Sequence, residues 1–310
     1  MTDLAEVSQR LLRAIRRWAG LLLVGSTLCL PACSTEEATP EETGLWFYVL
    51  VKSSNYAQDA NGELTLLNYH FFSEIFPKPG FKGGLRGELQ RQGSSDAPMV
   101  YVDRGKDFYF EGGHFDSVAE ADEAYPNGVY DFAITNDRVE VRASMTLGDA
   151  NGETDIPAPI RISLLQDDSL VSPLAVDHEK DLRVVWSDYS NGAADANGIV
   201  DDMIFVVVQN CQGERIVHTG LPFQNADYMT FREKELLIEG GTLKPGEPYA
   251  MFVEFPHVVD SSVAAGVPGF TSFATATYLD IETTGETIDS ACLAEMPAMD
   301  TGQTDRPAQH

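Results

Sequence analysis

The sequence predicts an all-β fold with two β-sandwich-like domains. Runs rich in aromatic and β-branched residues, such as Leu45–Val51, recur along the chain and are separated by turn-forming residues. The run Arg138–Met145 alternates polar and apolar residues, which is typical of a strand in a sheet with one face toward water. One short helix is expected, because Ser117–Glu120 has the pattern of a capping box and Pro126 disfavours helical geometry at Tyr125.

The predicted strands fall into two groups, which we interpret as two sequential domains covering residues 45–167 and 168–290. The first group is Leu45–Val51, Leu64–Phe72, Met99–Val102, Phe108–Phe110, Val129–Thr135, Val139–Leu147 and Ile160–Leu165. The second group is Asp181–Trp186, Met203–Gln209, Arg215–Thr219, Glu235–Ile238, Tyr249–Phe255 and Phe270–Ile281. Met203–Gln209 is a continuous apolar run, which is typical of a strand covered on both faces. The glycine-rich stretch Lys78–Gln92 is expected to be a loop.

Residues 1–32 have the pattern of a secretory signal peptide. Basic residues up to Arg17 precede an uncharged run that is too short to span a bilayer. The run ends in Leu30-Pro31-Ala32-Cys33, which resembles the lipobox of bacterial envelope lipoproteins. This resemblance implies cleavage before Cys33 by signal peptidase II and a lipid on its thiol. An ordinary signal peptide with a chance cysteine is the alternative.

Two further segments are expected to lack packed structure. Residues 33–44 are acidic and lack large apolar side chains until the chain reaches Leu45, so they are interpreted as a flexible tether. The composition of residues 291–310 predicts a disordered tail. Ser34 directly after the cysteine resembles lipoproteins of the Gram-negative outer membrane, so the expected location is the cell envelope, with a lipid anchor in that membrane.

The second domain resembles a fibronectin type III domain. Trp186 stands late in the second strand, and the motif L-x-P-G-x-x-Y, Leu243–Tyr249, precedes the sixth. The resemblance implies that Trp186 and Leu243 pack in the core and that Tyr249 forms a tyrosine corner with the nearby backbone. The domain is longer than usual, with the excess placed in the loops Ser187–Asp202 and Pro256–Pro268. A generic immunoglobulin-like sandwich is the alternative.

The same resemblance implies a disulfide between Cys211 and Cys292. In fibronectin topology one sheet has the strand order C′-C-F-G, so strands C and G run parallel and finish at the same end. Cys211 follows the predicted strand C, and Cys292 follows the predicted strand G by about ten residues, a length that easily spans two strand spacings. Two free thiols are the alternative.

A calcium site is considered because the sequence Asp-Ala-Asn-Gly occurs three times, at Asp59–Gly62, Asp149–Gly152 and Asp195–Gly198. It resembles the middle of an EF-hand loop, but no copy has the first ligand or the glutamate that closes such a loop. Tight turns explain all three copies, because Asn-Gly readily adopts positive φ. Around the third copy an irregular Ca²⁺ site remains an alternative, with the candidate ligands Asp188, Asn191, Asp195, Asn197, Asp201 and Asp202.

Basic residues gather in one window of an otherwise acidic chain whose formal net charge is −27. Such a window could face anionic head groups or an acidic partner, although a solvated hairpin is the alternative. The candidate residues are Lys78, Lys82, Arg86, Arg91, Arg104 and Lys106.

We expect a non-catalytic binding or structural module, anchored to the membrane by lipid, whose partner is an envelope protein or a polysaccharide. Nucleic acid is not expected as a partner because the acidic chain repels it. No nucleophile elbow, zinc-protease helix, Walker A or dinucleotide motif is found, and the histidines are scattered. The alternative is an envelope hydrolase that acts on polysaccharide with its site in the N-terminal domain. A pocket in the N-terminal domain that gathers two carboxylates between aromatic walls would favour the enzyme. No cofactor is expected apart from the candidate Ca²⁺.

Overall fold

The computed structural model describes residues 43–81, 84–137, 140–224 and 228–286, and this part of the chain is predominantly β-strand. Its one helix is α2 (Val118–Ala124), with Tyr125 as its C-cap. Ser117 Oγ caps the helix by accepting a hydrogen bond from Glu120 N at 3.2 Å, as the capping-box pattern predicts. None of the helices in the described ranges is long and apolar enough to cross a membrane.

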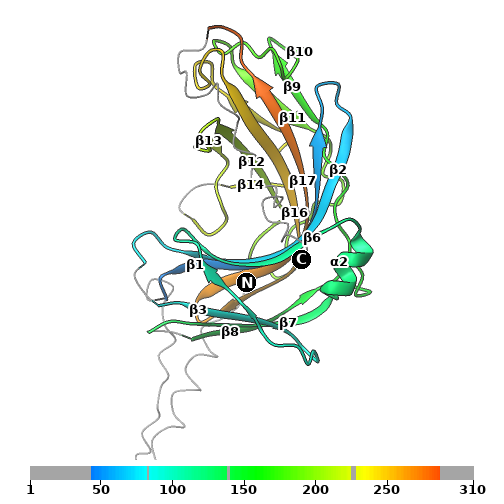
Figure 1. Cartoon of the computed structure of the whole chain (residues 1–310), viewed down its shortest axis with the longest axis vertical. Coiled ribbons are helices and arrows are strands. Elements are labelled where there is room, and N and C mark those ends of the chain that lie inside the picture. Colours follow the sequence, from blue (N-terminus) through cyan, green and yellow to red (C-terminus); the bar gives the residue numbers. More distant parts are fainter. Residues whose placement is uncertain (1–42, 82–83, 138–139, 225–227, 287–310) are drawn as a thin grey trace, which may run out of the picture. The chain divides into compact units, whose positions relative to one another are not determined.

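The largest element is a nine-stranded sheet that draws strands from both ends of the described chain (Figure 1). The order of its strands is β13 (Arg215–His218), β12 (Met203–Asn210), β16 (Pro248–Ala264), β17 (Val267–Glu282), β1 (Leu45–Gln58), β2 (Leu64–Pro77), β6 (Phe108–Phe115) and β5 (Val102–Asp103). The ninth strand, β14 (Met229–Thr230), pairs with β12. β1 runs parallel to β17, whereas the other pairs are antiparallel.

Two four-stranded sheets lie toward opposite ends of the large sheet (Figure 1). One has the order β10 (Ser169–Leu170), β9 (Ile162–Gln166), β11 (Leu182–Trp186) and β15 (Glu235–Ile238). The other has the order β4 (Met99–Val100), β3 (Arg86–Arg91), β7 (Gly128–Thr135) and β8 (Glu140–Leu147).

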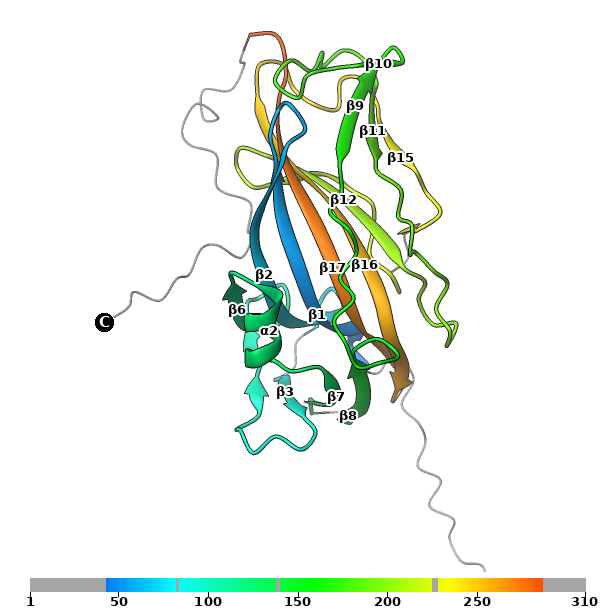
Figure 2. The same ribbon diagram turned by 90° about the vertical axis from the view of Figure 1, so that its right-hand side faces the viewer.

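Both small sheets pack on the same face of the large sheet (Figure 2). This follows from β17, because alternate side chains of a strand point to the same face. Val267 and Phe273 belong to the core under β3, β7 and β8, while Leu279 and Ile281 belong to the core under β9, β11 and β15. The even-numbered Phe270 and Ala274 point to the opposite face, where they join a third buried cluster. The fold is therefore two β-sandwiches that share one sheet.

The shared sheet corrects the predicted division into two sequential domains. The boundary after residue 167 would separate β1 from β17, yet these strands pair over 11 residues from Tyr48 to Gln58. The predicted loop Pro256–Pro268 is also strand. Here β16 and β17 continue as a hairpin into the sandwich that contains β3, β7 and β8. Proline has no N–H to donate, but Pro256 is tolerated there because β16 pairs with β12 only as far as Glu254. Beyond that residue β16 is an edge strand.

We call the part built on β9–β13 and β15–β17 the fibronectin-like sandwich, because its strands β13-β12-β16-β17 have the expected C′-C-F-G order. Trp186 and Leu243 are buried in its core, 5% and 4% exposed. Tyr249 Oη accepts a hydrogen bond from Lys244 N at 2.7 Å, which is the geometry expected of a tyrosine corner. The N-terminal sandwich, built on β1–β8 and the start of β17, has a similar contact: Tyr130 Oη donates to Pro126 O at 2.8 Å.

Candidate binding site

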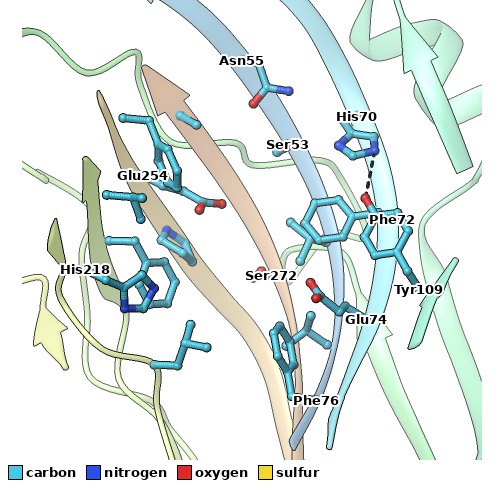
Figure 3. A pocket seen from close by; sticks show the side chains of 18 of the residues that line it. Ser53, Asn55, His70, Phe72, Glu74, Phe76, Tyr109, His218, Glu254 and Ser272 are labelled. Carbon is cyan, nitrogen blue, oxygen red and sulfur yellow. Dashed lines mark hydrogen bonds between the residues drawn. The ribbon is translucent and has the colours of Figure 1, made fainter. Parts of the chain in front are cut away.

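A trough of about 300 Å³ lies on the face of the nine-stranded sheet that points away from both small sheets (Figure 3). Alternate residues of five neighbouring strands line it, including Phe47 of β1, Phe72 of β2, Phe205 of β12, Phe252 of β16 and Phe270 of β17. β13 and the segment around β5 and β6 contribute its two sides. The trough therefore takes residues from both sandwiches and from segments more than 200 positions apart in the sequence.

Aromatic rings form much of the trough wall. The Phe47 ring stacks on the Phe76 ring with centroids 4.2 Å apart, and the Phe270 ring lies 6.0 Å from Phe47. Two further ring pairs have centroids 5.6 Å apart, Phe72 with Tyr109 and Phe252 with Tyr278. Phe47 and Phe270 are buried, whereas Phe72, Phe252 and Tyr278 are partly exposed and can offer flat apolar faces to a ligand.

Glu254 of β16 brings an ionisable group into this apolar wall. Burial raises the pKa of Glu254 to about 7, because a carboxylate in an apolar environment loses hydration. On the neighbouring strand, Ser272 Oγ is fully buried and has no hydrogen-bond partner among the described residues. Buried polar atoms are usually satisfied, so this hydroxyl is an exception in the floor of the trough.

A second carboxylate, Glu74 of β2, lies in the same trough (Figure 3). Burial and then the neighbouring carboxyl group of Asp107 raise the pKa of Glu74 well above its ordinary value, although Arg104 opposes the shift. Arg104 Nη2 lies 3.5 Å from Glu74 Oε1, and its Nε donates to Asp107 Oδ1 at 2.6 Å. The guanidinium also lies over the Tyr109 ring, 3.7 Å from its centroid.

Two histidines stand at different places along the trough. His218 lies on β13, where burial and then the charge of Arg215 lower its pKa. His70 lies on β2, and its Nε2 is 2.8 Å from Glu111 Oε1 and 3.4 Å from Tyr109 Oη (Figure 3). Among the described residues, His70, Glu111 and His114 form the one group of His, Cys, Asp or Glu whose ligand atoms gather closely enough to hold a metal ion. These histidines are scattered in the sequence, so no shared site was predicted from them.

The three Asp-Ala-Asn-Gly copies are tight turns. Asp59 Oδ1 accepts hydrogen bonds from Asn61 N and Glu63 N, and Asp149 Oδ1 accepts the equivalent pair from Asn151 N and Glu153 N. The third copy closes in the same way, with Gly198 N donating to the carbonyl of Asp195 at 3.0 Å. These aspartates are turn-forming residues whose carboxylates bind backbone amides.

Several of the six candidate Ca²⁺ ligands bind other groups of the protein in this structure. Asp202 is buried and accepts hydrogen bonds from Ala193 N and Val258 N, while its Oδ2 lies 2.8 Å from His257 Nδ1. Asp188 and Asp201 form ion pairs with lysine and arginine side chains at 3.1 and 2.7 Å. Asn191 and Asn197 lie in the same loop, where the Asn197 side chain donates to Ser261 O. The carboxylates therefore hold the loop together, and a calcium site remains an untested expectation.

The described basic residues of the predicted patch lie on different elements and do not form one group. Arg86 and Arg91 lie on β3, so part of the expected loop Lys78–Gln92 is strand, and Arg91 Nε donates to Asn127 O at 3.2 Å. Lys78 lies over the Trp46 ring. Arg104 and the exposed Lys106 line the trough instead. Lys82 lies outside the described residues.

Cys33, Cys292, the predicted signal peptide and the predicted tail also lie outside the described residues. Cys211 is buried at the end of β12, 6% exposed. Its pairing with Cys292 and the lipidation of Cys33 stay predictions.

No family model and no curated protein matches the sequence. Solved structures that resemble part of it include the FN1–FN3 domains of chicken CNTN1, at 11% identity and a TM-score of 0.23, covering 75% of this chain and 63% of that one. A cytokine receptor complex matches at 14% identity and a TM-score of 0.21, covering 71% and 94%. The BSP domain of a biofilm associated protein matches at 11% identity and a TM-score of 0.19, covering 76% and 30%. At these TM-scores the matches carry no argument about function.

Proposed function

We propose that this chain is a lipid-anchored cell-envelope protein that binds a polysaccharide in the trough without chemical turnover. The observation that carries the proposal is the trough itself, a concave surface of about 300 Å³ on the face opposite the two cores. Concave surfaces of this size, on which aromatic and polar side chains converge, are typical of binding sites.

The lining supports a sugar as the ligand class. Phe72, Phe252 and Tyr278 are only partly buried, so their rings can stack on the apolar faces of a pyranose. The Glu254 carboxyl lies in the same wall and can exchange hydrogen bonds with sugar hydroxyls. A carboxyl group with a pKa of about 7 is partly protonated near neutral pH, so it can donate as well as accept.

The anchor is supported by the lipobox-like Leu30–Cys33 alone. Mass spectrometry of the mature N-terminus tests it, with a lipid-modified Cys33 as the expected result. A Cys33→Ser protein is expected to be released from the membrane, because its one predicted anchor is removed. An unmodified N-terminus elsewhere in a membrane-free protein would overturn this part of the proposal.

Binding is tested on the soluble mature chain with Cys33 replaced by Ser. A panel of envelope oligosaccharides is titrated by calorimetry into this protein and into the variants Phe72→Ala and Tyr278→Ala. Loss of a stacking ring is expected to weaken binding by about tenfold, whereas Leu237→Ala, an exposed apolar residue of β15, is the matched control and should bind normally. Equal affinities for all four proteins, or no binding to any sugar, would contradict the proposal.

A polysaccharide hydrolase is the second candidate, because Glu74 and Glu254 share an aromatic-walled trough and both have raised pKa values. Glycosidases hold their two carboxyl groups about 5–10 Å apart. Here β17 and β1 lie between β16 and β2, and the register places Glu254 level with Asn68, six residues from Glu74, so the geometry favours binding over hydrolysis. The same oligosaccharides distinguish the two functions: product formation that Glu74→Gln and Glu254→Gln abolish, with binding retained, would establish the enzyme.

A further inference from the structure

The pairing of β2 with β6 brings two histidines and a glutamate to one side of the sheet. His70 lies directly opposite His114 in the antiparallel register, while Phe72 lies opposite Glu111. His70 and Phe72 are two residues apart and therefore share a face. Glu111 and His114 are three residues apart, a spacing that would put them on opposite faces of a regular strand.

A bulge in β6 removes this conflict. The register shifts between Phe71 and Phe72, where the two glycines Gly112 and Gly113 lie on the other strand. A Cβ at Gly112 would come within 2.6 Å of the Phe71 backbone oxygen, and Gly113 has φ +105°, which side chains rarely adopt. Both glycines are thus needed for a bulge whose extra residue turns Glu111 and His114 to the same side.

The three side chains are close and oriented. Their ligand atoms all lie within 4.8 Å of one another. The His70 and His114 rings stack with centroids 4.2 Å apart, and His70 Nε2 lies 2.8 Å from Glu111 Oε1. Gly113 N donates to the same Glu111 oxygen at 2.8 Å, which fixes the carboxylate from within the bulge. Supporting contacts of this kind are what orient metal ligands in proteins.

We propose that His70, Glu111 and His114, which we call the triad, form a binding site for a late first-row divalent cation, and specifically for Zn²⁺. Two imidazole nitrogens and one carboxylate oxygen are a ligand set that zinc accepts with an open fourth position, at zinc–ligand distances of about 2.0–2.2 Å. Ca²⁺ and Mg²⁺ prefer oxygen ligands and are poor matches for two imidazoles. Small side-chain rotations would bring the three ligand atoms to bonding distance of an ion. The ion would then take the place of the direct contact between His70 and Glu111.

The position of the site connects it to the trough. His70 and Tyr109 both line the trough, and Tyr109 Oη lies 3.4 Å from the His70 nitrogen that faces Glu111 (Figure 3). A metal ion here therefore lies at the trough margin, with a phenol oxygen near its open position.

Zinc affinity of the soluble mature chain, measured by competition with a chromophoric chelator, tests the proposal. Because the chain is strongly acidic, the titration contains 150 mM salt and millimolar Mg²⁺ and Ca²⁺, which occupy weak sites on surface carboxylates. The wild type is expected to bind one Zn²⁺ per chain. Glu111→Gln and His114→Gln are expected to weaken binding at least about tenfold, since even supporting residues of metal sites cost that much.

His218→Gln is the matched control, because this histidine also lines the trough but lies on β13, away from the triad. It should leave zinc affinity unchanged. Nitrogen-15 spectra of the imidazole rings give a readout independent of stability, with metal-dependent shifts expected for His70 and His114. No zinc uptake by the wild type, equal uptake by the triad variants, or an equal loss in His218→Gln would each overturn the assignment.

Discussion

The two sandwiches rest on the same sheet but differ in how much of the chain each one requires. The fibronectin-like sandwich takes its core from residues 160–281, one continuous segment. The N-terminal sandwich takes Leu45 through Leu147 and also needs Val267 and Phe273 of β17, which arrive from the far end of the chain. One half is therefore local in sequence, whereas the other is completed only when a long hairpin of its neighbour reaches across. The two halves are also joined directly, because the Gln58 side chain exchanges two 2.8 Å hydrogen bonds with the Ile162 backbone.

The largest expected effect comes from emptying either core. Phe255 of the fibronectin-like core and Phe132 of the N-terminal core are 2% and 1% exposed, so each change to Ala should cost about 3–5 kcal/mol of unfolding free energy. Because β17 belongs to both cores, both variants should shift a single cooperative transition in calorimetry. Leu237→Ala, which is exposed, should change little. Two separate transitions, each moved by only one variant, would show that the sandwiches are independent.

The next effect concerns a covalent link that only one half can have. Residues 45–167 contain no cysteine, whereas Cys211 ends β12 and Cys292 follows β17 in the sequence. A disulfide between them would enclose about 80 residues and stabilise the chain by roughly 4 kcal/mol on the loop-entropy model. In the Cys33→Ser background, Cys211→Ser should lower the unfolding free energy accordingly, and the unfolded, unreduced parent should have no reactive thiol. Two reactive thiols would exclude the link.

The same contrast explains what the sequence could predict of the fold. The tyrosine corner at Tyr249 and the helix cap at Ser117 are encoded within a few residues, so they could be identified without knowing the rest. The pairing of Tyr48 with Gly269 joins residues more than 200 positions apart, and no local pattern specifies it. The stretch Pro256–Pro268 was expected to be a loop because the domain is longer than usual, but it is strand, and Pro256 lies where that strand has become an edge.

The candidate site was harder to predict than the fold. Met203–Gln209 is apolar on both faces, so it was expected to be covered on both sides, yet Phe205 and Val207 line the trough. Apolar residues that meet a ligand and apolar residues that meet a second sheet look the same in sequence. The triad had a clearer signal, because paired glycines inside Glu111–His114 are typical of a bulge. The partner His70 still could not be chosen without the register of β2.

A test of stability against pH addresses Glu254, a carboxylate of the trough on β16. Burial raises the pKa of Glu254 to about 7, against 4.5 for an ordinary glutamate. Its stabilising contribution is therefore fully present below pH 4.5 and is lost as pH rises through 7. The loss amounts to up to about 3 kcal/mol. Urea unfolding of the wild type should show stability falling over this range, and Glu254→Gln should show a smaller fall.

The control for that test is Glu282→Gln, an exposed residue of β17 that should leave the slope unchanged. His257 also contributes in this range, because its hydrogen bond with Asp202 raises its pKa and its stabilisation is likewise lost on deprotonation. Only the difference between wild type and Glu254→Gln isolates Glu254. Glu74 lies beside Arg104 and Asp107, so Glu74→Gln should alter the profile through these charges as well. Identical slopes for wild type and Glu254→Gln would mean that Glu254 is hydrated in the folded chain.

The smallest expected effect comes from removing the hydroxyl groups of Tyr249 and Tyr130. The two hydroxyls make similar contacts, but one accepts from an amide and the other donates to a carbonyl. Tyr249 Oη accepts from Lys244 N at 2.7 Å and lies 3.3 Å from Glu247 Oε2, so Tyr249→Phe deprives an amide hydrogen of its acceptor. Tyr130 Oη donates to the carbonyl of Pro126, an acceptor that loses less when one partner is removed. We expect Tyr249→Phe to cost about 1–3 kcal/mol and Tyr130→Phe about 1 kcal/mol, measured by urea unfolding. Equal costs would mean that the two corners are equivalent, and that the fibronectin-like half owes no extra stability to its motif.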